Sequence, residues 1–127
     1  MYRVIAALFL IMVSTAVSWA QDLSPSVWRS ERGALLKVLW VDVGGDFSGV
    51  FLSAPTNPCP VVPYNMAGGV RGLRVRFQTS RDWTSDCSIS AVWFGRFVSP
   101  TTMVVRWIAT GPGGGVRIRG TEVFHRT

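Results

Sequence analysis

The stretch from Trp28 to Phe51 constrains the fold of this chain more than any other segment, because it contains two turn signals close together. Gly33 interrupts one short run of strand-forming residues, and Gly44-Gly45-Asp46 ends the Leu- and Val-rich run that follows. Runs of this length joined by glycine-containing turns are typical of antiparallel strands that are neighbours in sequence. The stretch therefore predicts the start of a meander, in a sandwich or an up-and-down barrel.

Period-two alternation continues through the rest of the chain. It places Leu73, Val75 and Phe77 on an inner face, and Ile118 and Glu122 likewise point inward from the last strand. Four prolines between residues 55 and 69 limit a fourth strand to a short one. The expected strands cover residues 28–32, 35–43, 47–54, 64–67, 72–77, 88–97, 102–110 and 116–124. Eight antiparallel strands in a meander close most simply as a barrel, so we predict an all-β, eight-stranded antiparallel up-and-down β-barrel.

The first twenty residues follow the layout of a secretory signal peptide. Arg3 provides a basic start, Val4 to Val17 form an apolar run, and Ser18-Trp19-Ala20 provides the small residues of a cleavage site before Gln21. The apolar run is shorter than the ~20 residues that a membrane-spanning helix needs. We therefore expect a cleaved signal at 1–20, one domain at 21–127, a secreted or periplasmic protein, and no membrane partner after cleavage.

The cysteines and the single histidine limit the chemistry of the chain. Cys59 and Cys87 are the only cysteines, and in an exported protein they suggest one intramolecular disulfide. No second Cys or His lies at ligand spacing near either of them, so we expect no metal site. A Ser-His or Cys-His nucleophile would have to use His125, close to the chain end. We therefore expect no enzymatic activity.

Arginine supplies nearly all of the formal charge of +6, since only Lys37 among the 13 basic residues is a lysine. The pairs Arg74/Arg76 and Arg117/Arg119 are spaced two apart, so each pair shares one strand face. Such stripes are interpreted as solvated outer faces of a barrel or as a subunit interface. The high pI of about 10.7 permits nucleic-acid binding, but we expect none in an exported protein.

Five motifs in chain order resemble the avidin and streptavidin family, and together they cover the whole mature domain. The first consists of Trp28, Gly33 and the run Gly45–Phe51. The others follow in the order Gly72-x-x-Val75-x-Phe77, Trp93-x-Gly95, Trp107 and Gly120-x-Glu122-x-Phe124. The resemblance implies a barrel that holds biotin, as a ligand rather than a cofactor, within its interior.

The resemblance also implies which residues contact the ligand. Phe77, Trp93 and Trp107 would form the aromatic walls of a largely pre-formed pocket. The positions that bind the ureido group correspond to Ser30, Ala34, Phe51, Ser53 and Glu122. Ala34 and Phe51 carry no polar side-chain group, so donors to the ureido carbonyl are depleted. We therefore expect biotin binding that is weaker than in typical family members.

Two expectations about assembly follow from the same resemblance. A disulfide between Cys59 and Cys87 would join the proline-rich loop after the third strand to the loop before the sixth, and it would resemble the disulfide between loops of the short, dimeric avidins. Tetrameric avidins lend a Trp to a neighbouring subunit from the span that corresponds to Gly111–Gly115, which has no aromatic residue here. We therefore expect a homodimer. An avidin-fold or lipocalin-like secreted binding or inhibitor protein without biotin affinity is the alternative.

Overall fold

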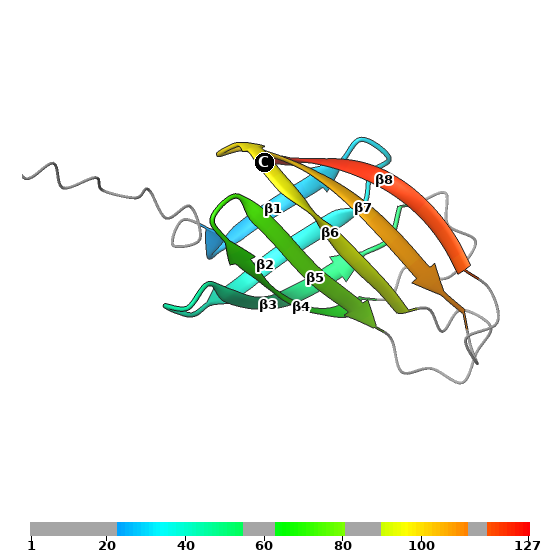
Figure 1. Cartoon of the computed structure of the whole chain (residues 1–127), viewed down its shortest axis with the longest axis horizontal. Helices are drawn as coiled ribbons and strands as arrows, with labels where there is room; N and C mark the ends of the chain where they lie inside the picture. Colours follow the sequence, from blue (N-terminus) through cyan, green and yellow to red (C-terminus); the bar gives the residue numbers. More distant parts are fainter. Residues whose placement is uncertain (1–22, 55–62, 81–89, 112–116) are drawn as a thin grey trace, which may run out of the picture.

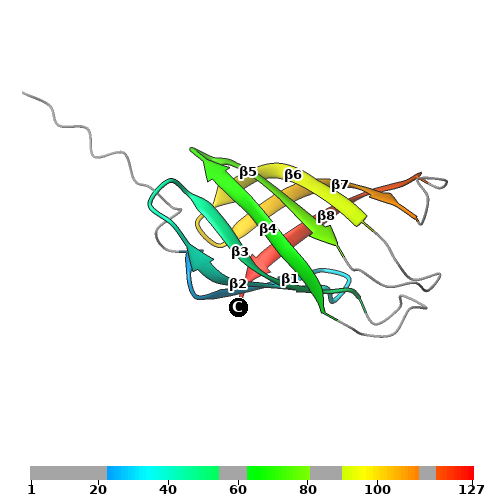
Figure 2. The same ribbon diagram turned by 90° about the horizontal axis from the view of Figure 1, so that it is seen from below.

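A computed structural model describes residues 23–54, 63–80, 90–111 and 117–127 of the chain. Its strands run antiparallel to their neighbours in chain order (Figures 1 and 2). They are β1 (Ser26–Ser30), β2 (Leu35–Val41), β3 (Asp46–Leu52), β4 (Tyr64–Arg71), β5 (Arg74–Ser80), β6 (Ser90–Ser99), β7 (Thr102–Thr110) and β8 (Arg117–Arg126).

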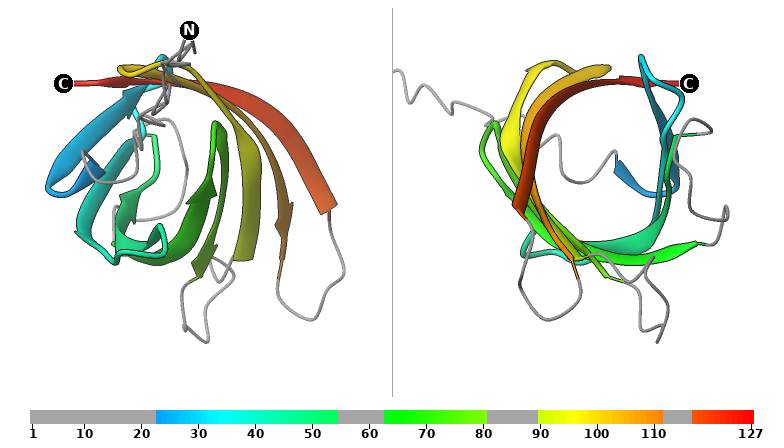
Figure 3. Two further views of the ribbon diagram at one scale, coloured as in Figure 1. Left: turned by 60° about the vertical axis from the view of Figure 1, so that its left-hand side comes forward. Right: turned by 90° about the vertical axis from the view of Figure 1, so that its right-hand side faces the viewer.

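The strands close into a barrel because β8 returns to pair with β1 (Figure 3). In this pairing Ser30 lies opposite Phe124. Closure pairs both edges of what would otherwise be an open sheet. The predicted all-β, eight-stranded up-and-down barrel is therefore confirmed.

Alternation along the strands fills the barrel interior with apolar side chains. In β5 every second residue is buried, which places Val75, Phe77 and Thr79 inside, while Arg74, Arg76, Gln78 and Ser80 are exposed. The largest fully buried side chains are those of Trp28, Phe77, Phe124, Leu36 and Met103. Such burial is the main favourable contribution to the folding of a barrel of this size.

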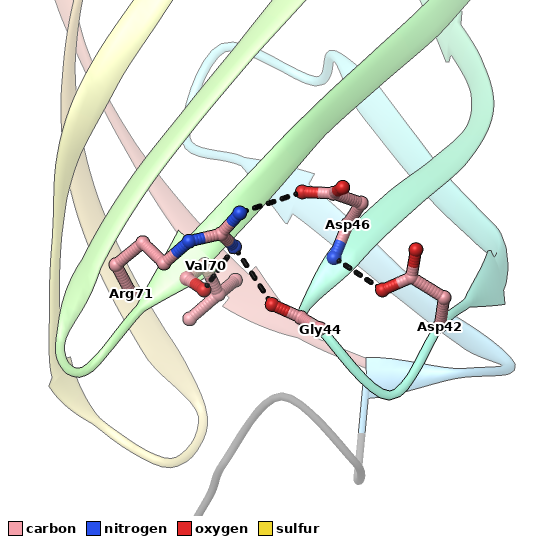
Figure 4. A network of polar contacts seen from close by, with 5 residues as sticks. All are labelled: Asp42, Gly44, Asp46, Val70 and Arg71. Atoms are coloured by element: carbon pink, nitrogen blue, oxygen red, sulfur yellow. Dashed lines mark hydrogen bonds and ion pairs between the residues drawn. The ribbon is translucent and has the colours of Figure 1, made fainter.

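The two ends of the barrel differ in character. At one end, called here the β1–β2 end, the chain turns through Gly33, whose φ of 92° lies in the region that favours glycine. At the opposite end, Arg71 donates hydrogen bonds to the Gly44 carbonyl (2.9 Å) and to Asp46 (3.0 Å), which links the β2–β3 and β4–β5 turns (Figure 4). Because Arg71 and Asp46 are mostly exposed, this ion pair contributes at most about 1 kcal/mol.

Strand β4 is longer than predicted, since it continues to Arg71 instead of ending at residue 67. The four prolines of this region all precede Tyr64, so every residue of β4 retains an N–H for the sheet. Strand β5 begins at Arg74, two residues later than expected, because Arg71 to Leu73 form the turn. Leu73 is consequently 52% exposed, and its predicted inward orientation is wrong.

Ile118 is a second residue that was expected inside and is exposed, by 55%. It pairs with Ala109 near the end of β7, at the rim of the barrel, where fewer strands surround a side chain. Strand β1 is also shifted toward the N-terminus, to Ser26–Ser30, because the Gly33 turn takes up the residues that follow. The alternation therefore predicted the faces of strand centres better than those of strand ends.

Two of the expectations concern residues that the structure does not describe. The predicted signal peptide and the Cys59–Cys87 disulfide lie outside the described residues. Within the described ranges, no helix is long and apolar enough to cross a membrane. The same ranges hold no group of three or more His, Cys, Asp or Glu side chains placed to bind a metal ion.

Candidate ligand-binding site

A row of aromatic residues crosses three neighbouring strands, β5 to β7, inside the barrel. Phe77 of β5 pairs with Trp93 of β6, which pairs with Trp107 of β7, which in turn pairs with Gly120 of β8. The three aromatic residues are those that the sequence predicts as pocket walls. Sheet register therefore brings the predicted walls together.

Trp93 lies at the centre of this cluster. Its ring stacks on Phe77, with centroids 5.5 Å apart and planes 9° apart, and it lies 5.9 Å from the ring of Trp107. Phe51 approaches Trp93 from β3, at 5.1 Å. The Trp93 indole N–H donates to Thr79 Oγ1 at 3.0 Å, so its one polar atom is satisfied within the barrel.

The Trp107 indole differs because its polar atom has no partner. A Cβ atom at Gly120 would lie 2.3 Å from Trp107 Cζ2, so the indole crosses β8 directly over this glycine. Trp107 Nε1 and Ser53 Oγ are both buried and have no hydrogen-bond partner in the structure, among the residues it describes. Since buried polar groups are normally paired, a donor and a hydroxyl left without partners indicate the place of a ligand or of water.

Polar groups gather at the β1–β2 end of the barrel. The Ser30 hydroxyl accepts a hydrogen bond from the Ala34 backbone N–H at 3.0 Å, and it lies close enough to the Glu122 carboxylate to affect the pKa of that group. Arg32, in the turn, places its Nε 3.8 Å from Glu122 Oε1. Ser30 and Ala34 are buried, and the side chain of Glu122 is only 9% exposed.

Burial dominates the protonation of Glu122. Desolvation raises the pKa of this carboxyl above its usual value of 4.5, because the charged form loses water. The Arg32 charge and the Ser30 hydroxyl oppose this rise, while the nearby Glu31 adds to it. Glu122 is thus a buried acceptor with a cation beside it, as expected of a group that receives a ligand N–H.

The predicted site residues fall into two groups. Phe51, Phe77, Trp93 and Trp107 form one aromatic cluster, and Ser30, Ala34 and Glu122 form one polar cluster. Ser53 lies just after β3, and no described contact connects it to either group.

Sequence reasoning missed two functional contacts. Arg32 lies in a turn, where no periodic pattern indicates which way its side chain points. Thr79 could have been identified, because it continues the inward alternation of Val75 and Phe77 beyond the expected strand end.

The arginine stripes lie outside the barrel. A groove of about 880 Å³ on the outer face of β5–β7 is lined by Arg74, Arg76, Arg96 and Arg106, with Phe94 and Val104 between them. It contains none of the eight predicted site residues. The stripes were predicted to face outward, and the outward placement of Arg74, Arg76, Arg117 and Arg119 is confirmed.

Known proteins resemble this chain in structure rather than in sequence. No family model and no curated protein matches it. The structure of apo shwanavidin matches with a TM-score of 0.72 at 22% identity, over 82% of this chain and 96% of that one. The bradavidin2–biotin complex matches with a TM-score of 0.68 at 26% identity, over 82% and 97%. The rhizavidin–biotin complex matches with a TM-score of 0.69 at 24% identity, over 82% and 92%.

The structure defines the class of protein as a closed, eight-stranded up-and-down barrel with aromatic side chains and a polar cluster in its interior. The comparisons then show which one: this chain has the avidin fold. The resemblance read from the sequence is confirmed in its fold and strand order. The similar proteins named above are avidins, two of them in complex with biotin, and none is an enzyme.

Proposed function

We propose that this protein is a secreted biotin-binding protein that takes its ligand inside the barrel. The observation that carries the proposal is the pair of buried, unpartnered polar atoms, Trp107 Nε1 and Ser53 Oγ, among the residues that the structure describes. Leaving each unpaired costs ~1–3 kcal/mol, so a ligand that pairs with them recovers this free energy on binding.

The two residue clusters suggest complementary roles. Phe51, Phe77, Trp93 and Trp107 offer aromatic surface to the apolar ring and tail of the ligand, whose burial drives binding. Glu122 accepts one ureido N–H, and Ser53 accepts the other. Similar proteins in complex with biotin, bradavidin2 and rhizavidin, support biotin as the ligand.

We expect the affinity for biotin to be lower than in typical avidins. Phe51 has a ring but no hydroxyl, and Ala34 has no polar side-chain atom, so neither can donate to the ureido carbonyl. This depletion favours a second candidate function, in which the same barrel serves as a secreted binding or inhibitor protein without biotin affinity.

Isothermal titration calorimetry with biotin distinguishes the two functions. Saturable binding with one biotin per chain supports the proposal, and the Trp93→Ala variant should then bind more weakly because the central wall is lost. The control is Trp40→Ala, since Trp40 is an exposed tryptophan of β2. Absence of heat at high micromolar protein would contradict biotin binding and favour the second function.

We further propose a homodimer in which Cys59 and Cys87 are joined and residues 1–20 are removed during export. Light scattering should give twice the chain mass, and a fourfold mass would contradict a dimer. Thiol titration of the denatured, unreduced protein should find no free thiol. Mass spectrometry of the exported protein should find Gln21 as the first residue.

A further inference from the structure

The polar end of the site is short of hydrogen-bond donors. Of the positions that could face a ligand carbonyl, Ala34 and Phe51 have no side-chain donor, and Ser30 has a single hydroxyl proton. That hydroxyl already accepts from the Ala34 backbone N–H, and it lies close enough to the Glu122 carboxylate to lower the pKa of that group. An ionised Glu122 competes with a ligand oxygen for the single Ser30 proton, so Ser30 is a poor donor to the ligand.

Arg32 is the cation beside this cluster. In the turn, Arg32 comes two residues after Ser30 and two residues before Ala34, so its backbone lies between two of the predicted site positions. Its Nε lies 3.8 Å from Glu122 Oε1, and its side chain is 64% exposed. A guanidinium carries five N–H donors in a planar fork, so most of them stay available when one faces a carboxylate.

We propose that Arg32 donates to the carbonyl oxygen of the ligand while Glu122 accepts the N–H next to it. This assignment rests on the proposed function. The acceptor on Glu122 and the donors on Arg32 lie side by side, which complements an N–H and a C=O on neighbouring atoms. Arg32 thereby takes the place of the donors that Ala34 and Phe51 lack.

The pairing defines a class of ligand. A cyclic urea, such as that of biotin, and a lactam both present an N–H beside a carbonyl oxygen, and both fit the Arg32–Glu122 pair. A group with a cation in place of the carbonyl oxygen does not fit, because it would meet the guanidinium charge. The site should therefore discriminate between biotin and 2-iminobiotin, in which a protonated imino group replaces the ureido oxygen.

The test is calorimetry of the full-length protein and its Arg32→Ala and Arg32→Lys variants with both ligands at neutral pH. Arg32→Ala should lower biotin affinity roughly 10-fold, the low end for a hydrogen bond to a charged group, because Arg32 is partly in solvent. Its affinity for 2-iminobiotin should stay equal or rise, because the repulsion is removed. Arg32→Lys keeps the charge but loses the fork, so it should fall between parent and Arg32→Ala for biotin.

Arg29→Ala is the matched control, because it removes the same charge from an exposed position on the outer face of β1. It should leave both affinities unchanged. If the parent binds biotin and Arg32→Ala binds it within twofold, the assignment of Arg32 is overturned and the proposed function stands. An equal loss for both ligands would also overturn it, since a structural defect does not discriminate between them. If the parent binds no biotin, the proposed function fails and the assignment fails with it.

Discussion

The indole of Trp107 lies directly over the Cα atom of Gly120, at a position where any side chain on β8 would collide with it. A Cβ at Gly120 would lie 2.3 Å from Cζ2 and 2.4 Å from Cε2 of the ring. The orientation of one wall of the candidate site therefore depends on the absence of a single methyl group on the neighbouring strand.

Gly120→Ala should displace the Trp107 indole, because an added Cβ would lie within 2.7 Å of three atoms of the ring. We expect a loss of ~1–3 kcal/mol in the free energy of unfolding, the usual cost of overpacking a core. Biotin affinity should fall as well. Urea denaturation and calorimetry provide the two measurements. Gly111→Ala is the control, since no atom of the described residues lies within 4 Å of its added Cβ, and equal effects at the two positions would contradict this prediction.

Glu122→Ala should weaken biotin binding by ~1.5–3 kcal/mol, the contribution of a hydrogen bond to a charged group. Folding should survive, because the change removes a buried carboxylate rather than creating one. Calorimetry measures the affinity, and thermal denaturation confirms the fold. Unchanged binding would mean that Glu122 is not the polar anchor of the ligand.

The unfolding free energy should depend on pH through Glu122. Burial raises the pKa of Glu122 in the native protein above 4.5, despite the opposing effects of Arg32 and Ser30. Between the unfolded and the native pKa the folded protein binds more protons, so its stability falls as pH rises through this window. Glu122→Gln lacks this contribution. The stability of the parent relative to the variant should thus decline from below pH 4.5 toward neutral pH, as followed by denaturation at several pH values. A constant difference would contradict the raised pKa.

Thr79→Val should destabilise the barrel by ~1–3 kcal/mol, because the buried N–H of Trp93 loses its acceptor while the volume of the side chain is kept. The shift of the urea midpoint measures this loss. Thr121→Val, on the exposed outer face of β8, should stay within ±0.5 kcal/mol. Similar effects of the two changes would show that the Trp93 hydrogen bond is not a source of stability.

The local pattern determined the orientation of the residues at strand centres. Alternation with period two was sufficient to point Phe77, Trp93, Trp107 and Glu122 inward, since a β-strand sends successive side chains to opposite faces. Turn glycines such as Gly33 marked where strands end. The orientation of these side chains and the positions of the turns depend on residues that are close in sequence, so they can be predicted from the sequence alone.

Only the tertiary structure decided which of these residues meet. The contact of Phe51 with Trp93 and the approach of Arg32 to Glu122 join segments far apart in the chain. They depend on how each strand is staggered against the next and on closure of β8 against β1, which no short stretch of sequence specifies. Leu73 and Ile118, both apolar and both exposed, show the same limit, because their positions at a turn and at the rim follow from where the strands end in three dimensions.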